Sequence, residues 1–241
     1  MLKRLVKMAT DMRGLPQVTI NLRCADTAGN DPFYERVVRD FYRDAMRRHP
    51  KFPLVRNYEY GFSVHHMAGE PDNYLRSIES AARRNYKKSC RLGYGFGLID
   101  YNAHLADITA ILRSAPVRQG RAMPADFFTR DAAPSNNPPS RSALHDYPYF
   151  GILRDGHLYA FASCLVAGEL CSIETIYGHA DHLADGVVPM MIIGIAEWIA
   201  THHPDVRYYA YGTYFGATDT MQRFKRKFDF KPHRARWVLG D

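Results

Sequence analysis

The chain has 241 residues, of which 46% are hydrophobic and 24% are charged. This composition can bury one hydrophobic core and excludes a chain that is disordered throughout. No run of about eighteen apolar residues occurs, and the N-terminus, MLKRLVKMATDMRG, lacks the apolar stretch and cleavage site of a secretion signal. We therefore expect a single globular unit, 1–241, in the cytoplasm and without a membrane span.

The net charge of +7 is concentrated in two segments. Residues 76–91 contain six basic side chains and one acidic one, and residues 223–236 contain seven basic side chains and one acidic one. Two basic segments in an otherwise slightly acidic chain indicate a phosphate-rich partner. Two solvated helix faces would give the same distribution, so both interpretations stay open at this point.

The cysteines have no CxxC spacing and are too few for a disulfide scaffold; they are Cys24, Cys90, Cys164 and Cys171. We expect them to be reduced packing residues. A two-residue turn at Ala167-Gly168 would place Cys164 opposite Cys171, and a disulfide could then form in an oxidising compartment.

The first half of the chain, 1–130, predicts alternating strands and helices. A helix over 31–49 has Asp31 as its N-cap and Pro32 in its first turn. A longer helix over 71–93 ends at Gly93 and carries Arg76, Arg83, Lys87 and Arg91 on one face. Strands are expected over 17–23 and 94–100, and Asn102 is expected to cap a helix over 102–115.

The segment 131–147 predicts a loop, because DAAPSNNPPSR combines three prolines with two asparagines. The region 148–241 then begins with a meander of three strands, whose turns are expected at Asp155-Gly156 and at Ala167-Gly168. A helix over 185–201, a strand over 206–212, a helix over 217–228 and a strand over 233–239 complete the pattern.

This order of elements matches the core of the GNAT acyltransferase fold, and three segments resemble the Fem family. RRNYKKSCRLGYGF (83–96) is similar to the family's RRN-containing helix, and LADITAILRSAPVRQGRAMPADFF (105–128) to the helix and R-x-G segment that follow it. YYAYGTYFGATDTMQRFKRKFDF (208–230) resembles its C-terminal segment with FK-x-x-F. Fem proteins transfer amino acids from aminoacyl-tRNA to peptidoglycan precursors. The resemblance implies the fold class α/β, GNAT-like, with a mixed, mostly antiparallel sheet flanked by helices.

The sequence also departs from these families. Fem proteins usually contain two such lobes, whereas this chain has the length of one lobe and an extension, and Asp229 stands in place of the family's final glycine. Acetyl-CoA enzymes of the fold carry a Q/R-x-x-G-x-G/A loop whose backbone N–H groups hold the pyrophosphate. GHADHLADGVV (178–188) does not fit that loop. We therefore expect no bound cofactor and favour aminoacyl-tRNA as the co-substrate, with acyl-CoA as the alternative.

Acyl transfer to an amine needs a base, a group that stabilises the oxyanion and a proton donor. Glu174 lies in a strand that is expected to be central, where a charged residue is costly without a purpose. Lys225 corresponds, by resemblance, to a Fem lysine beside the reacting carbonyl. Tyr211 and Tyr214 are candidate proton donors. The opposing interpretations are a solvent-facing position for Glu174 and a solvated helix face for Lys225.

Further residues are candidates for binding tRNA or another substrate. They are Arg83, Arg84, Lys87, Lys88, Arg118, Arg121, Phe224 and Arg226. Any one of the basic residues alone would be an ordinary surface charge, and the hypothesis concerns the cluster.

We expect no metal centre. His65 and His66 are adjacent, so in a strand they would point to opposite faces, and His179, Asp181 and His182 have no further ligand at a persuasive spacing.

The favoured function is an amide-bond-forming transfer of an aminoacyl group from aminoacyl-tRNA to a small amine acceptor, peptide or nucleotide-linked. One alternative is an N-acyltransferase that uses acyl-CoA or an acyl-carrier protein, whose acidic surface would suit the basic segments. Another is a non-catalytic RNA-binding domain. The sequence leaves a homo-oligomer open.

Overall fold

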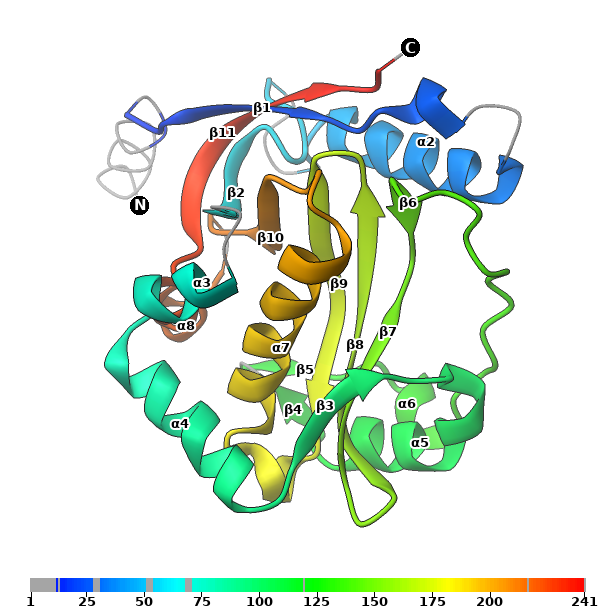
Figure 1. Ribbon diagram of the computed structural model, residues 1–241, viewed down its shortest axis with the longest axis vertical. Coiled ribbons are helices and arrows are strands. Elements are labelled where there is room, and N and C mark those ends of the chain that lie inside the picture. Colours follow the sequence, from blue (N-terminus) through cyan, green and yellow to red (C-terminus); the bar gives the residue numbers. More distant parts are fainter. Residues whose placement is uncertain are drawn as a thin grey trace.

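A computed structural model describes residues 12, 14–27, 31–50, 54–67, 71–118, 120–215 and 217–240. Its centre is a nine-stranded mixed sheet with the order β1-β11-β2-β10-β9-β8-β7-β3, in which β6 also pairs with β8 (Figure 1). The strands are β1 Gln17–Asn21, β2 Tyr60–His66, β3 Gly95–Leu98, β6 His145–Asp146, β7 Tyr149–Arg154, β8 His157–Ala167, β9 Leu170–Gly178, β10 Tyr208–Thr213 and β11 Lys231–Val238. Among the strand pairs that the structure describes in this sheet, only β1–β11 and β9–β10 are parallel. The expected mixed, mostly antiparallel sheet is therefore confirmed.

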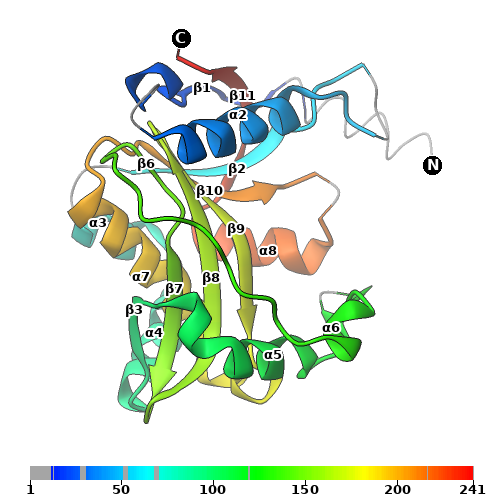
Figure 2. The ribbon, with the colours of Figure 1, turned by 90° about the vertical axis from the view of Figure 1, so that its right-hand side faces the viewer.

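Helices cover both faces of this sheet. Those of α type are α2 Pro32–Met46, α3 Pro71–Ser77, α4 Ser80–Arg91, α5 Leu105–Arg113, α6 Asp126–Thr129, α7 Val187–His202 and α8 Asp219–Lys227. Short 3₁₀ helices are η1 Cys24–Thr27, η2 Tyr101–His104 and η3 Ala180–Asp185, and β4 Val117–Arg118 forms a small hairpin with β5 Arg121–Ala122. Figure 2 shows α7 on one side of β7, β8 and β9 and α5 on the other.

The burial of each helix follows its sequence pattern. Helix α7 is apolar on most sides, and Val187 to Ile199 are largely buried because the sheet lies on one side of the helix and α3 and α4 on the other. Helix α2 is amphipathic and buries Tyr34, Val38 and Phe41. The Asp31 side chain accepts a hydrogen bond from the Tyr34 amide, so the expected N-cap is confirmed.

The single helix expected over 71–93 is wrong, because the segment forms two helices. The backbone of Glu79 is extended, with ψ of 150°. The Arg83 guanidinium then donates to the carbonyl oxygens of Leu75 (3.0 Å) and Ile78 (2.6 Å) at the end of α3. Helix α4 ends at Arg91, and Gly93 adopts a positive φ of 82° just beyond it.

The turn expected at Ala167-Gly168 is displaced by one residue. Ala167 pairs with Leu170, so the turn residues are Gly168 and Glu169. Cys171 therefore lies opposite Val166 and not opposite Cys164, and none of the four cysteines forms a disulfide. The carbonyl of Glu169 accepts hydrogen bonds from the amides of Arg207 and Tyr208, which explains this register by contacts from a distant strand.

Other expectations from the sequence agree with the structure in part. The Asp155-Gly156 turn is confirmed, with positive φ at both residues. The α-helix expected from 102 begins at Leu105 after η2, and Asp100, not Asn102, caps that segment by accepting from the Asn102 amide (2.9 Å). Of the loop expected over 131–147, residues 131–144 form neither helix nor strand, whereas 145–146 form β6, which pairs with β8. Strand β2 was not among the elements expected from the sequence.

Candidate active site

Strands β9 and β10 diverge in the middle of the sheet. They pair only over 170–172 and 208–210. On β9, Cys164 pairs with Ile173 and Ser163 with Thr175, so Glu174 is an additional residue in a β-bulge. Bulges bend a strand and increase its twist. This bulge therefore places Glu174 at the point where β9 leaves its neighbour.

A second irregularity lies on β10. Ala210 pairs with Val64 and Thr213 with Phe62, so β10 has one more residue than β2 over this stretch. Gly212 lies within it at φ 51°, a conformation that glycine adopts without steric cost. The two bulges face the same opening in the sheet.

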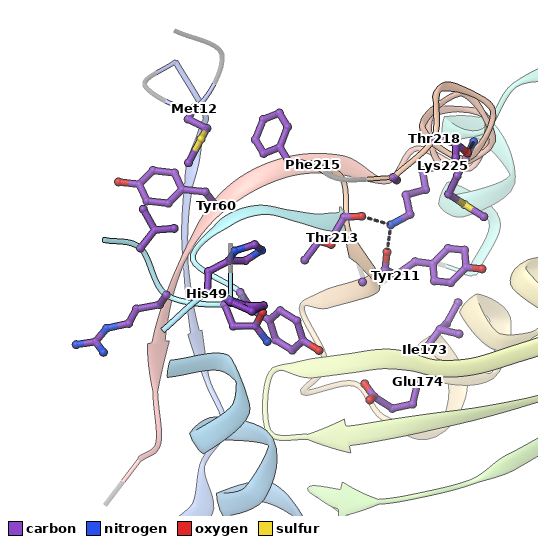
Figure 3. A pocket seen from close by; sticks show the side chains of 18 of the residues that line it. Met12, His49, Tyr60, Ile173, Glu174, Tyr211, Thr213, Phe215, Thr218 and Lys225 are labelled. Atoms are coloured by element: carbon purple, nitrogen blue, oxygen red, sulfur yellow. Dashed lines mark hydrogen bonds between the residues drawn. The ribbon is translucent and has the colours of Figure 1, made fainter. Parts of the chain in front are cut away.

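A cavity of about 650 Å³ occupies this opening (Figure 3). Its walls come from several elements: His49, Pro50, Val55, Arg56, Asn57 and Tyr58 before β2, Tyr60 on β2, Arg121 on β5, Ile173 and Glu174 on β9, Tyr211, Gly212 and Thr213 on β10, Phe215, Ala217, Thr218, Met221 and Lys225 towards and on α8, and Met12. In Figure 3, Glu174 extends from β9 and Lys225 from α8, so they enter from different walls. The fold thus brings three of the expected catalytic residues, Glu174, Lys225 and Tyr211, to the walls of one cavity.

The Glu174 side chain is exposed to this cavity, which encloses it within protein walls. The enclosure raises the pKa of Glu174, the Ser172 hydroxyl opposes the rise as a hydrogen-bond donor, and the Asp44 carboxylate adds to it. No described basic side chain forms an ion pair with Glu174. A carboxylate with a raised pKa and solvent access is suited to accept a proton.

Lys225 is 4% exposed. Its Nζ donates to the carbonyl oxygens of Tyr211 (2.5 Å) and Thr213 (2.7 Å) and lies 3.4 Å from Ser63 Oγ. The two carbonyls flank Gly212, so the ammonium pairs with backbone acceptors at the β10 bulge. Burial lowers the pKa of Lys225 to about 7. Its solvated-face interpretation is therefore wrong, because the side chain is buried in the cavity wall.

Helix α8 holds Lys225 in place. The Thr218 side chain caps the helix by accepting from the Met221 amide (3.3 Å). Phe224 packs against the main core, and its ring centroid lies 4.9 Å from that of Phe228. Phe224 does not line the cavity and anchors the helix, whereas Lys225 reaches the cavity from the neighbouring position.

The two candidate tyrosines are placed differently. Tyr211 contributes its carbonyl to Lys225, while its ring points away from Glu174 and lies 5.9 Å from the ring of Phe230 (Figure 3). The Tyr214 hydroxyl accepts a hydrogen bond from Arg226, and neither of these two side chains lines the cavity. The structure therefore joins Tyr214 and Arg226 to each other and not to Glu174.

The basic side chains of α4 lie outside the cavity, and two of them have internal partners. Arg83 caps α3, and Lys88 Nζ donates to the Ala184 carbonyl (2.8 Å). Arg84 and Lys87 are exposed, and Arg84 lies 3.3 Å from Ser80 Oγ. Of the four α4 residues expected to bind a substrate, Arg84 and Lys87 are the ones available to an external anion.

The remaining two candidate arginines, Arg118 and Arg121, lie in different surroundings. The Arg118 guanidinium donates to the carbonyls of Gly178 (2.8 Å) and Ile111 (2.6 Å) and to Ser114 Oγ (2.9 Å), and burial lowers its pKa. It ties the end of β9 to α5. Arg121, three residues further along, lines the cavity.

The segment before β2 was missed by the sequence expectations. Tyr58 lies in the cavity wall, and its pKa is raised to about 12 by burial, by the Asp44 carboxylate and by Glu174. Its ring centroid is 5.7 Å from that of Phe62. The available signal was the aromatic pair Tyr58 and Tyr60, of which Tyr60 begins β2, although no motif marks it.

The N-terminus of α7 is closed in this chain. Residues 180–185 form η3, and Asp185 accepts a hydrogen bond from the Tyr94 hydroxyl (2.9 Å), which lowers the pKa of Asp185. A Cβ atom on Gly186 would lie 2.4 Å from the carbonyl oxygen of Asn85, so α4 packs directly against this helix end. No residue of 178–190 lines the cavity. The Asp185 carboxylate thus lies beside the N-terminus of α7.

The described ranges contain no group of three or more His, Cys, Asp and Glu side chains that could hold a metal ion. No helix within those same ranges has the length and apolar character needed to cross a bilayer.

No protein-family model matches the chain, and no curated protein matches it. Among solved structures, FemX has a TM-score of 0.55 at 10% identity, over 72% of this chain and 59% of FemX. The C-terminal domain of a putative lysylphosphatidylglycerol synthetase from Agrobacterium fabrum gives 0.48 at 14% identity, over 72% of this chain and 57% of that one. A tandem GNAT protein from the clavulanic acid biosynthesis pathway gives 0.44 at 12% identity, over 73% and 50%. The chain therefore spans less than two thirds of these proteins, and the expected Fem-like, GNAT-type resemblance is confirmed for the fold.

Proposed function

We propose that the chain is an amide-bond-forming acyltransferase that moves an aminoacyl group from aminoacyl-tRNA to the amine of a small acceptor. The observation that carries this proposal is the placement of Glu174 and Lys225 in one cavity between the diverging strands β9 and β10. A carboxylate and an ammonium supply two of the functions that acyl transfer to an amine requires.

Glu174 is assigned as the general base. An amine acceptor is protonated near neutral pH and must lose a proton before its lone pair can attack an acyl carbon. The carboxylate of Glu174 is exposed to the cavity and has a raised pKa, so it can take that proton. No covalent intermediate on the protein is needed.

Lys225 is assigned to stabilise the oxyanion that forms as the amine attacks. Its three N–H donors face three protein acceptors, and the 3.4 Å contact with Ser63 is the longest. A reacting carbonyl oxygen would replace Ser63 as an acceptor while the two backbone carbonyls keep the ammonium oriented. The same ammonium then protonates the departing ribose oxygen and regains a proton from the attacking nitrogen, which must lose its second proton to become the amide.

The choice of acyl donor rests on the exposed basic residues of α4 and on the surroundings of the N-terminus of α7. Asp185, Tyr94 and Asn85 occupy the surroundings of the helix N-terminus, and Asp185 is paired there with Lys88 (3.6 Å), so the protein's own groups fill the place that a pyrophosphate would need. The exposed residues Arg84 and Lys87 suit the phosphates of a nucleic acid. These features favour aminoacyl-tRNA over acyl-CoA.

The donor assignment is tested by binding. Purified protein is titrated with bulk aminoacylated tRNA and with coenzyme A across a salt series. We expect tRNA affinity to fall steeply with salt and coenzyme A to show no saturable binding. Micromolar coenzyme A binding with weak tRNA binding would replace this donor by acyl-CoA. Salt-dependent tRNA binding that is followed by no transfer to any acceptor amine would instead support the non-catalytic RNA-binding domain.

A further inference from the structure

Two histidines that are far apart in the sequence meet on the sheet. His66 is the last residue of β2, and His233 lies in β11, the antiparallel neighbour of β2. Their Nε2 atoms are 3.2 Å apart, and their ring centroids are 5.1 Å apart. Neither histidine is among the residues that line the cavity. The pair is therefore independent of the proposed acyl transfer.

The surroundings of His233 determine which of its nitrogens carries the proton. Its Nδ1 lies 2.8 Å from the carbonyl oxygen of Lys231. A carbonyl can only accept, so Nδ1 carries the proton and Nε2 directs a lone pair at His66. The hydrogen bond between the rings then uses a proton on His66 Nε2. His66 is exposed, so this proton can move to Nδ1 and leave two lone pairs facing each other.

This geometry matches metal coordination by two imidazoles. Nitrogens bound at about 2.0–2.1 Å to one tetrahedral zinc ion are about 3.3–3.4 Å apart, close to the observed separation. Metal-binding histidines commonly donate their other N–H to a backbone carbonyl, as His233 does. We propose that His66 and His233 bind one divalent transition-metal ion, zinc in the first instance, through their Nε2 atoms, with water in the remaining positions.

Each of the two basic side chains near the pair has an acidic partner, which offsets part of its repulsion of a bound cation. Lys231 forms an ion pair with Asp229 (2.7 Å), and Arg207 forms one with Glu169 (3.1 Å). The ring of Tyr208 meets that of His66 edge to face at 5.4 Å and covers one side of the site. The exposed side of His66 leaves room for the water ligands.

The sequence could not reveal this pair, because it places His66 beside His65 and not beside His233. His65 points elsewhere, and its Nδ1 lies 2.9 Å from Asp229. With two protein ligands the ion is exchangeable, and it joins β2 to β11 without touching Glu174 or Lys225. Its effect is to stabilise this part of the sheet.

The test uses the full chain after removal of metal with a chelator. Zinc chloride is titrated while bound zinc is measured by equilibrium dialysis and the melting temperature is recorded. We expect one zinc per chain and a rise of about 5–10 °C when free zinc is about a hundred times its dissociation constant. H66Q should lose both effects, whereas H157Q, which alters an exposed histidine, should keep them.

A second measurement removes the dependence on how well a variant folds. Copper(II) bound to the unmodified protein should show electron paramagnetic resonance couplings to two imidazole nitrogens, and H66Q should show one. The proposal is overturned if no zinc binds, or if H66Q binds zinc with the same stoichiometry and thermal shift as the unmodified chain. Either of those results would leave the pair as a hydrogen bond between two rings.

Discussion

Replacing Lys225 by methionine should change how stability depends on pH. Burial lowers the pKa of Lys225 to about 7 from the ordinary lysine value of 10.5. Between these two values the unfolded chain carries a proton on this side chain that the folded chain has released. Stability of the unmodified protein should therefore rise with pH above 7, and the cost of burying the charge is fully present below pH 7.

The magnitude follows from the shift. One unit of pKa corresponds to about 1.4 kcal/mol, and the lysine is half deprotonated in the folded state at pH 7. Between pH 7 and pH 9 this group alone should add about 2 kcal/mol to the free energy of unfolding. K225M lacks this contribution at both pH values. It also leaves the carbonyls of Tyr211 and Thr213 without their donor, which costs about 1–3 kcal/mol for each at either pH.

The assay is urea unfolding of the unmodified chain, K225M and K87M at pH 7 and pH 9. The difference between the two pH values, compared across variants, cancels every other titrating group that the variants share. K87M removes an exposed lysine of α4 and should behave like the unmodified chain. Equal pH dependence in the unmodified chain and K225M would refute the argument that Lys225 is buried with a lowered pKa.

Three further predictions concern the surroundings of the site. G212A should lower the free energy of unfolding by about 1–2 kcal/mol, because φ at Gly212 is 51°. The control G97A, at a position with an ordinary φ and open space, should change this free energy little. Urea unfolding measures both variants. R118Q should lower the free energy of unfolding by about 2–4 kcal/mol through lost hydrogen bonds and leave the affinity for tRNA unchanged. A loss of tRNA affinity in the folded variant would indicate that Arg118 binds tRNA. The double variant R84Q/K87Q should reduce the slope of tRNA affinity against salt by about 2, and an unchanged slope would place the tRNA elsewhere.

Local patterns predicted most of the second half of the fold. The Asp155-Gly156 turn, the α7 helix and the capped α8 helix each depend on residues close together in the sequence. The break between α3 and α4 could not be predicted this way, because it depends on distant contacts: the Glu79 amide donates to the Lys227 carbonyl, and Arg223 pairs with Glu79. The displaced β8–β9 turn likewise depends on β10.

The sequence predicted individual residues of the candidate site, but it did not predict how they are arranged in space. Glu174 and Lys225 are singled out by charge in apolar surroundings and by resemblance, and the fold places both in one cavity. The bulges that open the cavity are shifts in the pairing register between neighbouring strands. Such shifts cannot be predicted from a single sequence. Positive charge also could not separate Arg118, which is used to hold β9, from Arg121, which lines the cavity.

The proposed reaction, aminoacyl transfer to an amine, can be followed with labelled donor. Protein is mixed with bulk tRNA that carries radiolabelled amino acids and with a panel of small amines and amine-bearing peptides, and labelled amide product is followed with time. We expect product with the unmodified chain, a rate lower by about a hundred- to ten-thousandfold with E174Q, and an unchanged rate with E35Q, whose glutamate pairs with Arg39 on α2. Transfer by E174Q at the rate of the unmodified chain, or transfer from acyl-CoA but not from tRNA, would contradict the account.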